Sequence, residues 1–209
     1  MALSQKNNRR RLLRACANAW LGLRRLLAPP TYGRWPACAM LLSAVFLSAP
    51  ASAQVSKEYQ LKAVFLWRLA QFTEWPSDAF ENPESPIVIC VLGDNPFDGA
   101  LTAAVSGETA HGRRFVVQLL RVIEQAKTCH ILYTTSGAAR QTKEIATALA
   151  GKSVLTVRDG SASASSFETV IVFISEQNKI RMRIHLKAAV AARLVLDPRL
   201  LRAAEVIGE

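Results

Sequence analysis

The sequence contains few of the residues from which catalytic sites are usually built. Its 209 residues include only three histidines and four cysteines. No histidine is spaced with a glutamate or a second histidine as a zinc-binding helix requires. The chain also has no Gly-x-Ser-x-Gly elbow, no Walker loop and no Gly-x-Gly-x-x-Gly after its first strand. We therefore predict a protein that is not an enzyme, with no catalytic residues, no metal site and no cofactor.

Acidic residues are absent from the first 53 positions, which carry eight of the 26 basic residues. Residues 54–209 hold 18 basic and 16 acidic groups, a net charge of +2, although the whole chain has a formal net charge of +10. Nucleic-acid binding needs clustered cations on the folded part of a protein. The distribution of charge therefore argues against a nucleic-acid partner.

No apolar run reaches the length of about 20 residues that a membrane span requires. The uncharged run at 37–47 is followed by Ala51-Ser52-Ala53, an A-x-A cleavage site. A basic leader, a short apolar run and small residues before the cleavage point are typical of a secretory signal peptide. We predict that residues 1–53 are this signal peptide and that residues 54–209 form one exported, periplasmic domain.

Only two cysteines, Cys90 and Cys129, lie beyond the predicted cleavage site, each in a short apolar run with β-branched residues. In an oxidising compartment such a pair favours a disulfide. Closing a loop of about 40 residues would stabilise the fold by roughly 4 kcal/mol. The alternative is two buried, reduced thiols that pack as small hydrophobic residues.

The remaining pattern alternates short apolar runs with helical periodicity. It predicts a first helix from Ser56 to near Trp75, and a C-terminal segment, 187–206, that is largely helical. Between them we expect strands at 87–92, 115–119, 129–133 and 153–157, helices at 97–105 and 140–150, and a hairpin of 169–174 with 180–186. Strands separated by helices predict the α/β class. The expected architecture is a single-domain sandwich with a mixed, mainly parallel sheet, flanked by helices and carrying one C-terminal antiparallel hairpin.

Two tryptophans and a row of basic residues are the candidates for a partner-binding surface. Trp67 lies off the apolar stripe of the first helix, and Trp75 closes that helix. Along the second arm of the hairpin, Arg181, Arg183 and His185 alternate with apolar residues and are expected to face outward from an edge strand. Such a row suits an acidic partner surface. The alternatives are a tryptophan enclosed by the core and a solvated basic face.

The turn Gly93-Asp94-Asn95 follows the first predicted strand. Open α/β sheets bind ligands at the carboxyl ends of their strands. We therefore predict Gly93, Asp94 and Asn95 as a small-molecule site, with a plain strand-to-helix turn as the alternative. A periplasmic small-molecule-binding module is the second functional hypothesis, and a hydrolase is the third.

Several blocks of the sequence resemble the YfiR-like (YfiR/HmsC-like) periplasmic proteins. The segments KAVFLWRLAQFTEWP at 62–76 and ICVLGDNPF at 89–97 are similar to the opening helix and the first strand of that family. CHILY at 129–133 and GKSVLTV at 151–157 continue the resemblance in order, and the hairpin at 172–186 matches more loosely. The resemblance covers nearly all of the chain beyond the leader.

The resemblance implies a non-catalytic regulator that binds the periplasmic sensor part of an inner-membrane diguanylate cyclase. Repression of the cyclase would lower cyclic di-GMP and reduce biofilm formation, and an outer-membrane lipoprotein could sequester the regulator. In the family, the cysteines matching Cys90 and Cys129 are linked to redox control. Beyond the predicted signal peptide, the chain lacks the second cysteine pair of some members and has His185 where the family often has asparagine. A homodimer stays open as the oligomeric state.

Overall fold

The computed structural model describes residues 56–160, 168–177 and 179–208. The predicted signal peptide, residues 1–53, lies outside these ranges. Among the described residues, no helix is both long enough and apolar enough to cross a bilayer.

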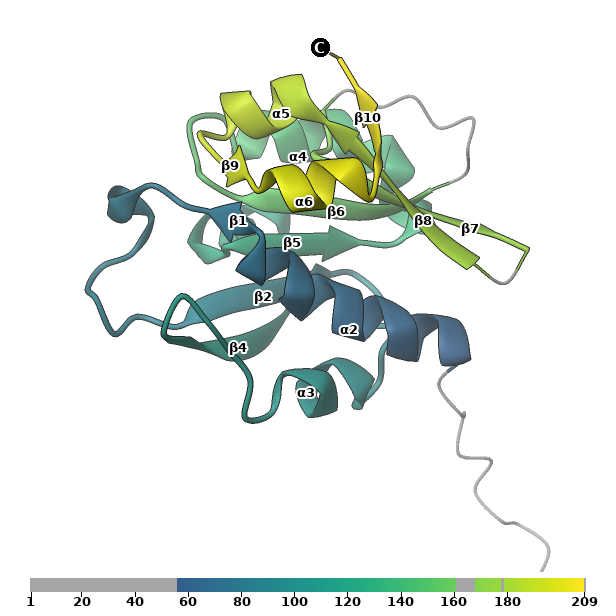
Figure 1. Ribbon diagram of the computed structural model, residues 1–209, viewed down its shortest axis with the longest axis horizontal. Helices are drawn as coiled ribbons and strands as arrows, with labels where there is room; N and C mark the ends of the chain where they lie inside the picture. The colour runs from purple at the N-terminus through teal and green to yellow at the C-terminus, as the bar shows by residue number, and fades with distance from the viewer. Residues whose placement is uncertain (1–55, 161–167, 178, 209) are drawn as a thin grey trace, which may run out of the picture. The chain divides into compact units, whose positions relative to one another are not determined.

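Helices and strands alternate along most of the described chain (Figure 1). The helices are α2 (Lys57–Gln71), α3 (Ala100–Val105), α4 (Thr142–Ala148), α5 (Leu186–Ala191) and α6 (Pro198–Arg202), with 3-10 turns η2 (Ser77–Ala79), η3 (Ile123–Thr128) and η4 (Ser136–Gln141). The strands are β1 (Thr73–Glu74), β2 (Ile87–Leu92), β3 (Thr109–Ala110), β4 (Arg113–Leu120), β5 (Ile131–Thr134), β6 (Leu155–Gly160), β7 (Ile171–Glu176), β8 (Lys179–His185), β9 (Val195–Leu196) and β10 (Glu205–Ile207).

Eight of these strands form one sheet in the order β10-β8-β7-β6-β5-β2-β4-β3. The pairings from β7 through to β4 are all parallel, and so is the pairing of β10 with β8. The β7–β8 hairpin and the short β3–β4 contact are antiparallel. A second, two-stranded sheet pairs β1 with β9. The predicted α/β class, with a mainly parallel sheet and one C-terminal hairpin, is confirmed.

The sheet is covered on both faces, which explains the continuously apolar central strands. On one face, Ile89 of β2 and its neighbours pack against Leu66 of α2, Leu101 of α3 and Leu200 of α6. Figure 1 shows α2, α3 and α6 in front of the sheet. On the other face, a smaller apolar cluster packs beneath η3 and α4, with members Cys90, Leu92, Leu120, Ile123, Ala126, Cys129, Leu132, Ile145, Leu149 and Val154.

The first helix is shorter than the sequence predicts. It ends at Gln71, and the chain becomes extended at Thr73 rather than near Trp75. The imidazole of His111 lies 2.9 Å from the Ala70 carbonyl, and the amide of Asp197 donates to the Phe72 carbonyl. These long-range contacts satisfy carbonyls that a continuing helix would otherwise use.

The C-terminal segment also differs from the expected largely helical run. It contains two short helices, α5 and α6, and two strands, β9 and β10. Strand β10 pairs with β8 at Arg183, Ile184 and His185, so β8 is not the edge strand over this part of its length. The expectation of an edge strand there is therefore wrong, because β10 returns from the end of the chain to cover it.

Candidate functional site

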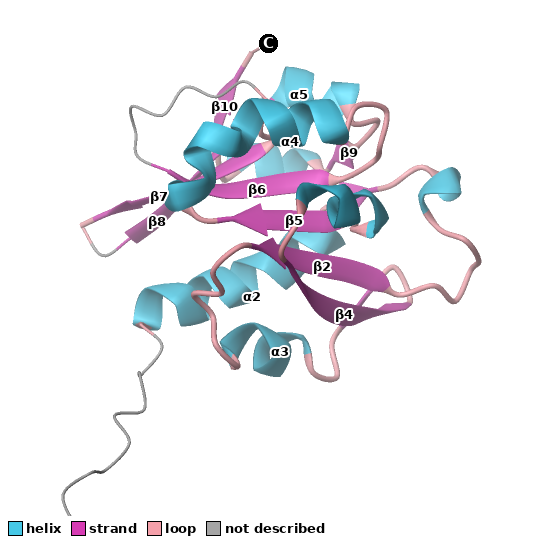
Figure 2. Cartoon of the chain, turned by 180° about the vertical axis from the view of Figure 1, so that it is seen from behind, coloured by secondary structure: helices cyan, strands magenta, loops and turns pink. Residues whose placement is uncertain are grey.

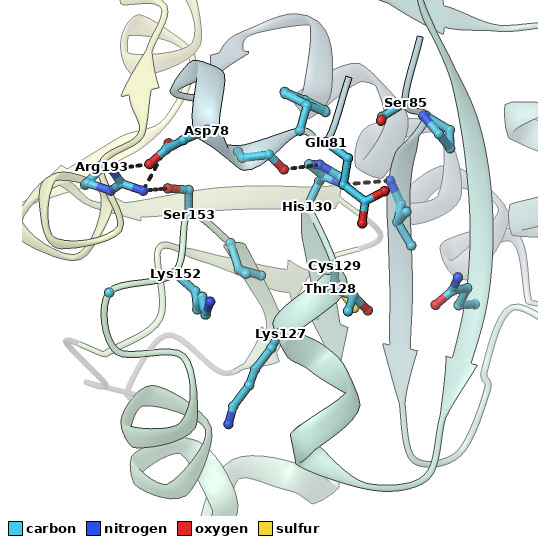
Figure 3. Close-up of a pocket in the computed structure, with 17 residues that line it drawn as sticks. Asp78, Glu81, Ser85, Lys127, Thr128, Cys129, His130, Lys152, Ser153 and Arg193 are labelled. Atoms are coloured by element: carbon cyan, nitrogen blue, oxygen red, sulfur yellow. Dashed lines mark hydrogen bonds and ion pairs between the residues drawn. The ribbon is translucent and has the colours of Figure 1, made fainter. Parts of the chain in front are cut away.

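A pocket of about 570 Å³ opens at the edge of the sheet where the parallel strands begin (Figure 3). Val88 of β2, His130 just before β5 and Val154 just before β6 form its strand-side wall. The opposite walls come from the η2 loop and from the segment that follows α5. The pocket therefore lies at the amino ends of the strands, opposite to the edge that carries the Gly93–Asn95 turn.

His130 is held in one tautomer at the wall of this pocket. The Val88 amide donates to Nδ1 at 3.1 Å, so that nitrogen carries no proton, and Nε2–H donates to the Ala79 carbonyl at 3.1 Å. The ring stacks on Phe80 with centroids 4.4 Å apart. Burial lowers the pKa of His130. The hydrogen bond to the Ala79 carbonyl opposes this shift, and the positive charge of Arg113 adds to it. A neutral imidazole thus ties the η2 loop to β2.

Charged side chains line the rest of the pocket. Arg193 forms a two-point ion pair with Asp78, at 2.9 and 3.2 Å, and also donates to Ser153 Oγ. Lys127 and Lys152 are both exposed and lie on the same side of His130 in Figure 3. With Arg193, the two lysines outnumber the acidic lining residues Asp78 and Glu81, and such an excess of positive charge suits a small anionic ligand.

Acidification is expected to destabilise the folded chain through His130. The unfolded histidine takes up a proton near its ordinary pKa of about 6.5, while the folded imidazole resists protonation. Stability is therefore full above that pH and falls as the pH drops toward the lowered folded pKa, by at most about 1.4 kcal/mol per pH unit for each histidine. The buried His185, whose pKa is lowered by burial and then by Arg183 and Arg158, acts in the same direction.

The His130→Asn variant tests this expectation, because an asparagine oxygen can replace Nδ1 as the acceptor for Val88 without titrating. Urea unfolding at pH 7.5 and pH 5.5 should show a smaller loss of stability in the variant than in the parent chain. An equal loss in both would show that His130 does not carry the pH dependence.

The predicted ligand turn uses its polar groups within the fold. The Asn95 side chain accepts from the Phe97 amide at 3.0 Å and donates to the Asp98 carbonyl. Gly93 adopts a φ of +85°, a conformation that favours glycine. Phe97 is buried and packs edge-on against Tyr59 and Tyr133. These contacts explain the sequence of the turn, and a ligand at Gly93, Asp94 and Asn95 stays a prediction.

The predicted approach of the two cysteines is confirmed. Cys90 and Cys129 form a disulfide with their Cα atoms 5.9 Å apart. Both side chains are buried within the smaller apolar cluster, and Cys129 also lines the pocket. The bond joins β2 to the end of η3 and so fixes the wall that carries His130.

The structure buries the two candidate tryptophans to different extents. Trp67 is only 8% exposed and packs edge-on against Phe115, so its position matches the alternative of a tryptophan enclosed by the core, and its part in partner binding stays a prediction. The guanidinium carbon of Arg68 lies 5.4 Å from the centroid of the Trp67 ring. Trp75 is half-buried between Phe80 and His130. Its part in partner binding stays a prediction.

The basic row on β8 is also only partly exposed. Arg181 is exposed, Arg183 is half-buried and forms an ion pair with Glu205 at 3.1 Å, and His185 is buried. The expected outward position of His185 is therefore wrong. The pairing of β8 with β10 and the chain turning into α5 directly after it bury the residues at this end of the strand.

A buried lysine lies on the inner side of α2, where the sequence pattern suggests no functional group. The side chain of Lys62 is 2% exposed, and its Nζ lies 2.8 Å from Asp159 Oδ1 and 2.5 Å from Glu58 Oε1. Asp159 also accepts from the Tyr59 hydroxyl. Burial and then the charge of Asp159 raise the pKa of Tyr59 to about 12, and the same two causes raise the pKa of Tyr133.

Sequence reasoning missed both the pocket and the buried lysine. Lys127, Lys152 and Arg193 come from η3, the turn after α4 and the segment after α5, so no local motif connects them. The one available signal was a histidine next to an apolar strand. Among the described residues, no group of three or more His, Cys, Asp or Glu side chains could hold a metal ion.

Comparison with known proteins identifies the family. No curated protein matches the sequence significantly. A family model described as YfiR/HmsC-like matches residues 59–205, which include the pocket, the disulfide and all but the first two residues of α2. This match spans well over half of the chain, and the chain belongs to the YfiR/HmsC-like family.

Proposed function

We propose that the chain represses a membrane-bound diguanylate cyclase by binding the cyclase's periplasmic sensor part. The observation that carries this proposal is the family match over 59–205, because the family is known for periplasmic regulation of diguanylate cyclases and is regulatory rather than catalytic. The proposal includes export by residues 1–53, a cyclic di-GMP level that falls when the regulator is bound, and a second contact with an outer-membrane lipoprotein.

The tip of the β7–β8 hairpin is our candidate for the contact with the cyclase. The pairing of β6 with β7 ends at Ile174, and β10 covers β8 only from Arg183 onward. The tip therefore extends past both neighbouring strands, as Figure 1 shows. Arg181 lies opposite Ile174, at the base of this projecting part, and is exposed. An exposed guanidinium on a projecting hairpin suits an acidic surface.

A deletion strain provides the first test in cells. Loss of the gene is expected to raise cyclic di-GMP, because the cyclase loses its inhibitor. A tagged chain purified from intact cells should bring a diguanylate cyclase with it in the membrane fraction. Unchanged cyclic di-GMP together with no cyclase in the purified material would refute the proposal.

The Arg181→Glu variant tests the hairpin itself. We expect the charge reversal to weaken co-purification of the cyclase and to raise cyclic di-GMP, with melting temperature unchanged because the side chain is exposed. Lys143→Glu, at an exposed position of α4, is the matched control and should leave both readouts as in the parent chain. Equal cyclase capture by both variants would exclude Arg181 from the interface.

A small-molecule-binding module is the second candidate function, and the pocket beside His130 favours it. Its volume of about 570 Å³ lies in the range of small-molecule sites. A thermal-shift screen of anionic metabolites should then find a ligand that raises the melting temperature. The shift should disappear in a Lys127→Ala, Lys152→Ala double variant. A screen without any shift would leave the regulator as the sole proposal.

A further inference from the structure

The eight-stranded sheet ends in one short edge and one long one. At one end lies β10, which has only three residues, and short edge strands offer little to a foreign strand. At the other end, β3 pairs with β4 at Arg113 and Arg114 alone. Among the described residues, no strand pairs with the outer side of β4 from Phe115 to Leu120. Figure 2 shows β4 at the border of the sheet.

The free side of β4 carries a regular row of backbone groups. Successive residues of a strand direct their N–H and C=O groups to opposite sides. The Leu120 carbonyl accepts from the Gly93 amide at 3.0 Å, so it points toward β2. By alternation, the backbone groups of Phe115, Val117 and Leu119 point away from β2 toward the open edge. This row begins where β3 stops.

Several apolar side chains at this edge are exposed, although Phe115 and Val117 pack against the core and Gln118 is polar. Val116 is 40% exposed, Leu119 is 59% exposed, and Val122 just beyond the strand is 48% exposed. Proteins usually protect a free edge with charges, proline or a bulge. Here the six residues from Phe115 to Leu120 include no charge and no proline. Their composition suits the addition of an extended strand from another chain.

The charges at the two ends of the edge indicate the chemistry of that strand. Arg114 and Arg121 are both exposed, and neither has an ion-pair partner among the described residues. In an antiparallel pairing of two copies of β4, Arg121 of each copy would come opposite Arg113 or its neighbour in the other. Like charges opposite each other destabilise a strand pair. A strand with acidic residues at both ends meets no such repulsion.

We propose that the edge of β4 from Phe115 to Leu120 binds an extended segment of a partner protein by strand addition. The segment has alternating apolar residues and an acidic residue at each end, which lie beside Arg114 and Arg121. This surface is separate from the β7–β8 hairpin, at the opposite end of the sheet, and does not depend on the proposed repression of a cyclase.

A labelled peptide, acetyl-Glu-Val-Thr-Val-Thr-Val-Asp-amide, is the probe for this edge. The fluorescence anisotropy of this peptide, titrated with the full chain, should show saturable binding. A peptide with lysine at both ends should bind at least about fivefold more weakly, since it loses the attraction to the two arginines. Hydrogen exchange followed by NMR should show new protection at the amides of Phe115, Val117 and Leu119, with little change at Val116 and Gln118.

Two variants separate backbone pairing from charge. Leu119→Pro removes one outward N–H from an exposed position and should weaken binding by about fivefold or more. Arg114→Glu should reverse the preference between the two peptides while keeping the parent melting temperature. Val190→Lys, at an apolar position that is 72% exposed on α5, is the control and should bind as the parent does.

Three results would overturn the proposal. The first is no saturable binding of the acidic peptide by the parent chain. The second is equal binding of the acidic and lysine-ended peptides. The third is a concentration-dependent dimer that Leu119→Pro abolishes, which would assign the edge to a second copy of this chain. If the deletion strain has normal cyclic di-GMP but the peptide binds, the regulatory proposal fails and this one stands.

Discussion

Replacing Lys62 with methionine is expected to lower the free energy of unfolding by about 3–5 kcal/mol. The ammonium group is buried between Asp159 and Glu58, and it also lies 4.7 Å from the centroid of the Tyr59 ring. Methionine preserves most of the side-chain volume but leaves Asp159, which is 6% exposed, without its cation. A buried carboxylate that loses its cation is costly because it has lost its hydration, and the Tyr59 hydroxyl that still donates to it carries no charge.

A set of related variants separates this cause from simple loss of packing. Lys57→Met changes an exposed lysine at the start of the same helix and should alter stability by no more than about 0.5 kcal/mol. Adding Asp159→Asn to Lys62→Met removes the carboxylate that Lys62→Met leaves without a cation. The double variant should therefore lose about 0.5–3 kcal/mol less free energy of unfolding than the sum of the losses in the two single variants. Urea unfolding measures the parent chain and the four variants, which include Asp159→Asn alone. A loss below about 1 kcal/mol for Lys62→Met would mean that the pair behaves as a surface ion pair.

Opening the Cys90–Cys129 disulfide is expected to cost about 4 kcal/mol of stability in the chain-entropy model. The two cysteines are separated by 39 positions, so the bond removes many conformations from the unfolded chain. Both cysteines are buried, and Cys129 also lines the pocket beside His130. Urea unfolding with and without a phosphine reductant measures the effect.

The Cys90→Ala, Cys129→Ala double variant is the control for the reductant. It should be less stable than the oxidised parent and should show no further change when reductant is added. A parent chain that loses less than about 1 kcal/mol on reduction would contradict the expected contribution of the bond. Amide hydrogen exchange should also be faster at His130 in the reduced chain, because the disulfide holds the segment that enters β5.

Much of the fold follows from local pattern. The apolar run at Ile87–Leu92 predicts a strand covered on both faces, and the structure confirms a strand with those bounds. The clean alternation at 180–186 predicts one arm of a hairpin, which is present as β8. These segments succeed because side-chain period and β propensity act within a few residues. The two cysteines in apolar runs likewise pointed to neighbouring strands.

The errors concern contacts between segments far apart in the sequence. The outward position of His185 fails because β10, some twenty residues later, pairs beside it. The enclosure of Trp67 was left open because Phe115, which packs against it, lies on a strand nearly fifty residues away. The pocket at the amino edge of the sheet was missed because loops of unrelated sequence meet there, while a ligand at the carboxyl-edge turn stays a prediction.

The sequence by itself therefore determined the α/β class, the order of the central strands and helices along the chain and the resemblance to the family, and it favoured the pairing of Cys90 with Cys129, which the structure then confirmed. Only the tertiary structure decided that Lys62 is buried against Asp159, that Arg181 stays exposed while Arg183 pairs with Glu205, and which edge of the sheet is free. The physical reason is the separation along the chain over which each effect acts. Periodicity and propensity act between neighbours in the chain, whereas burial and charge pairing are set by whichever distant segment packs on top.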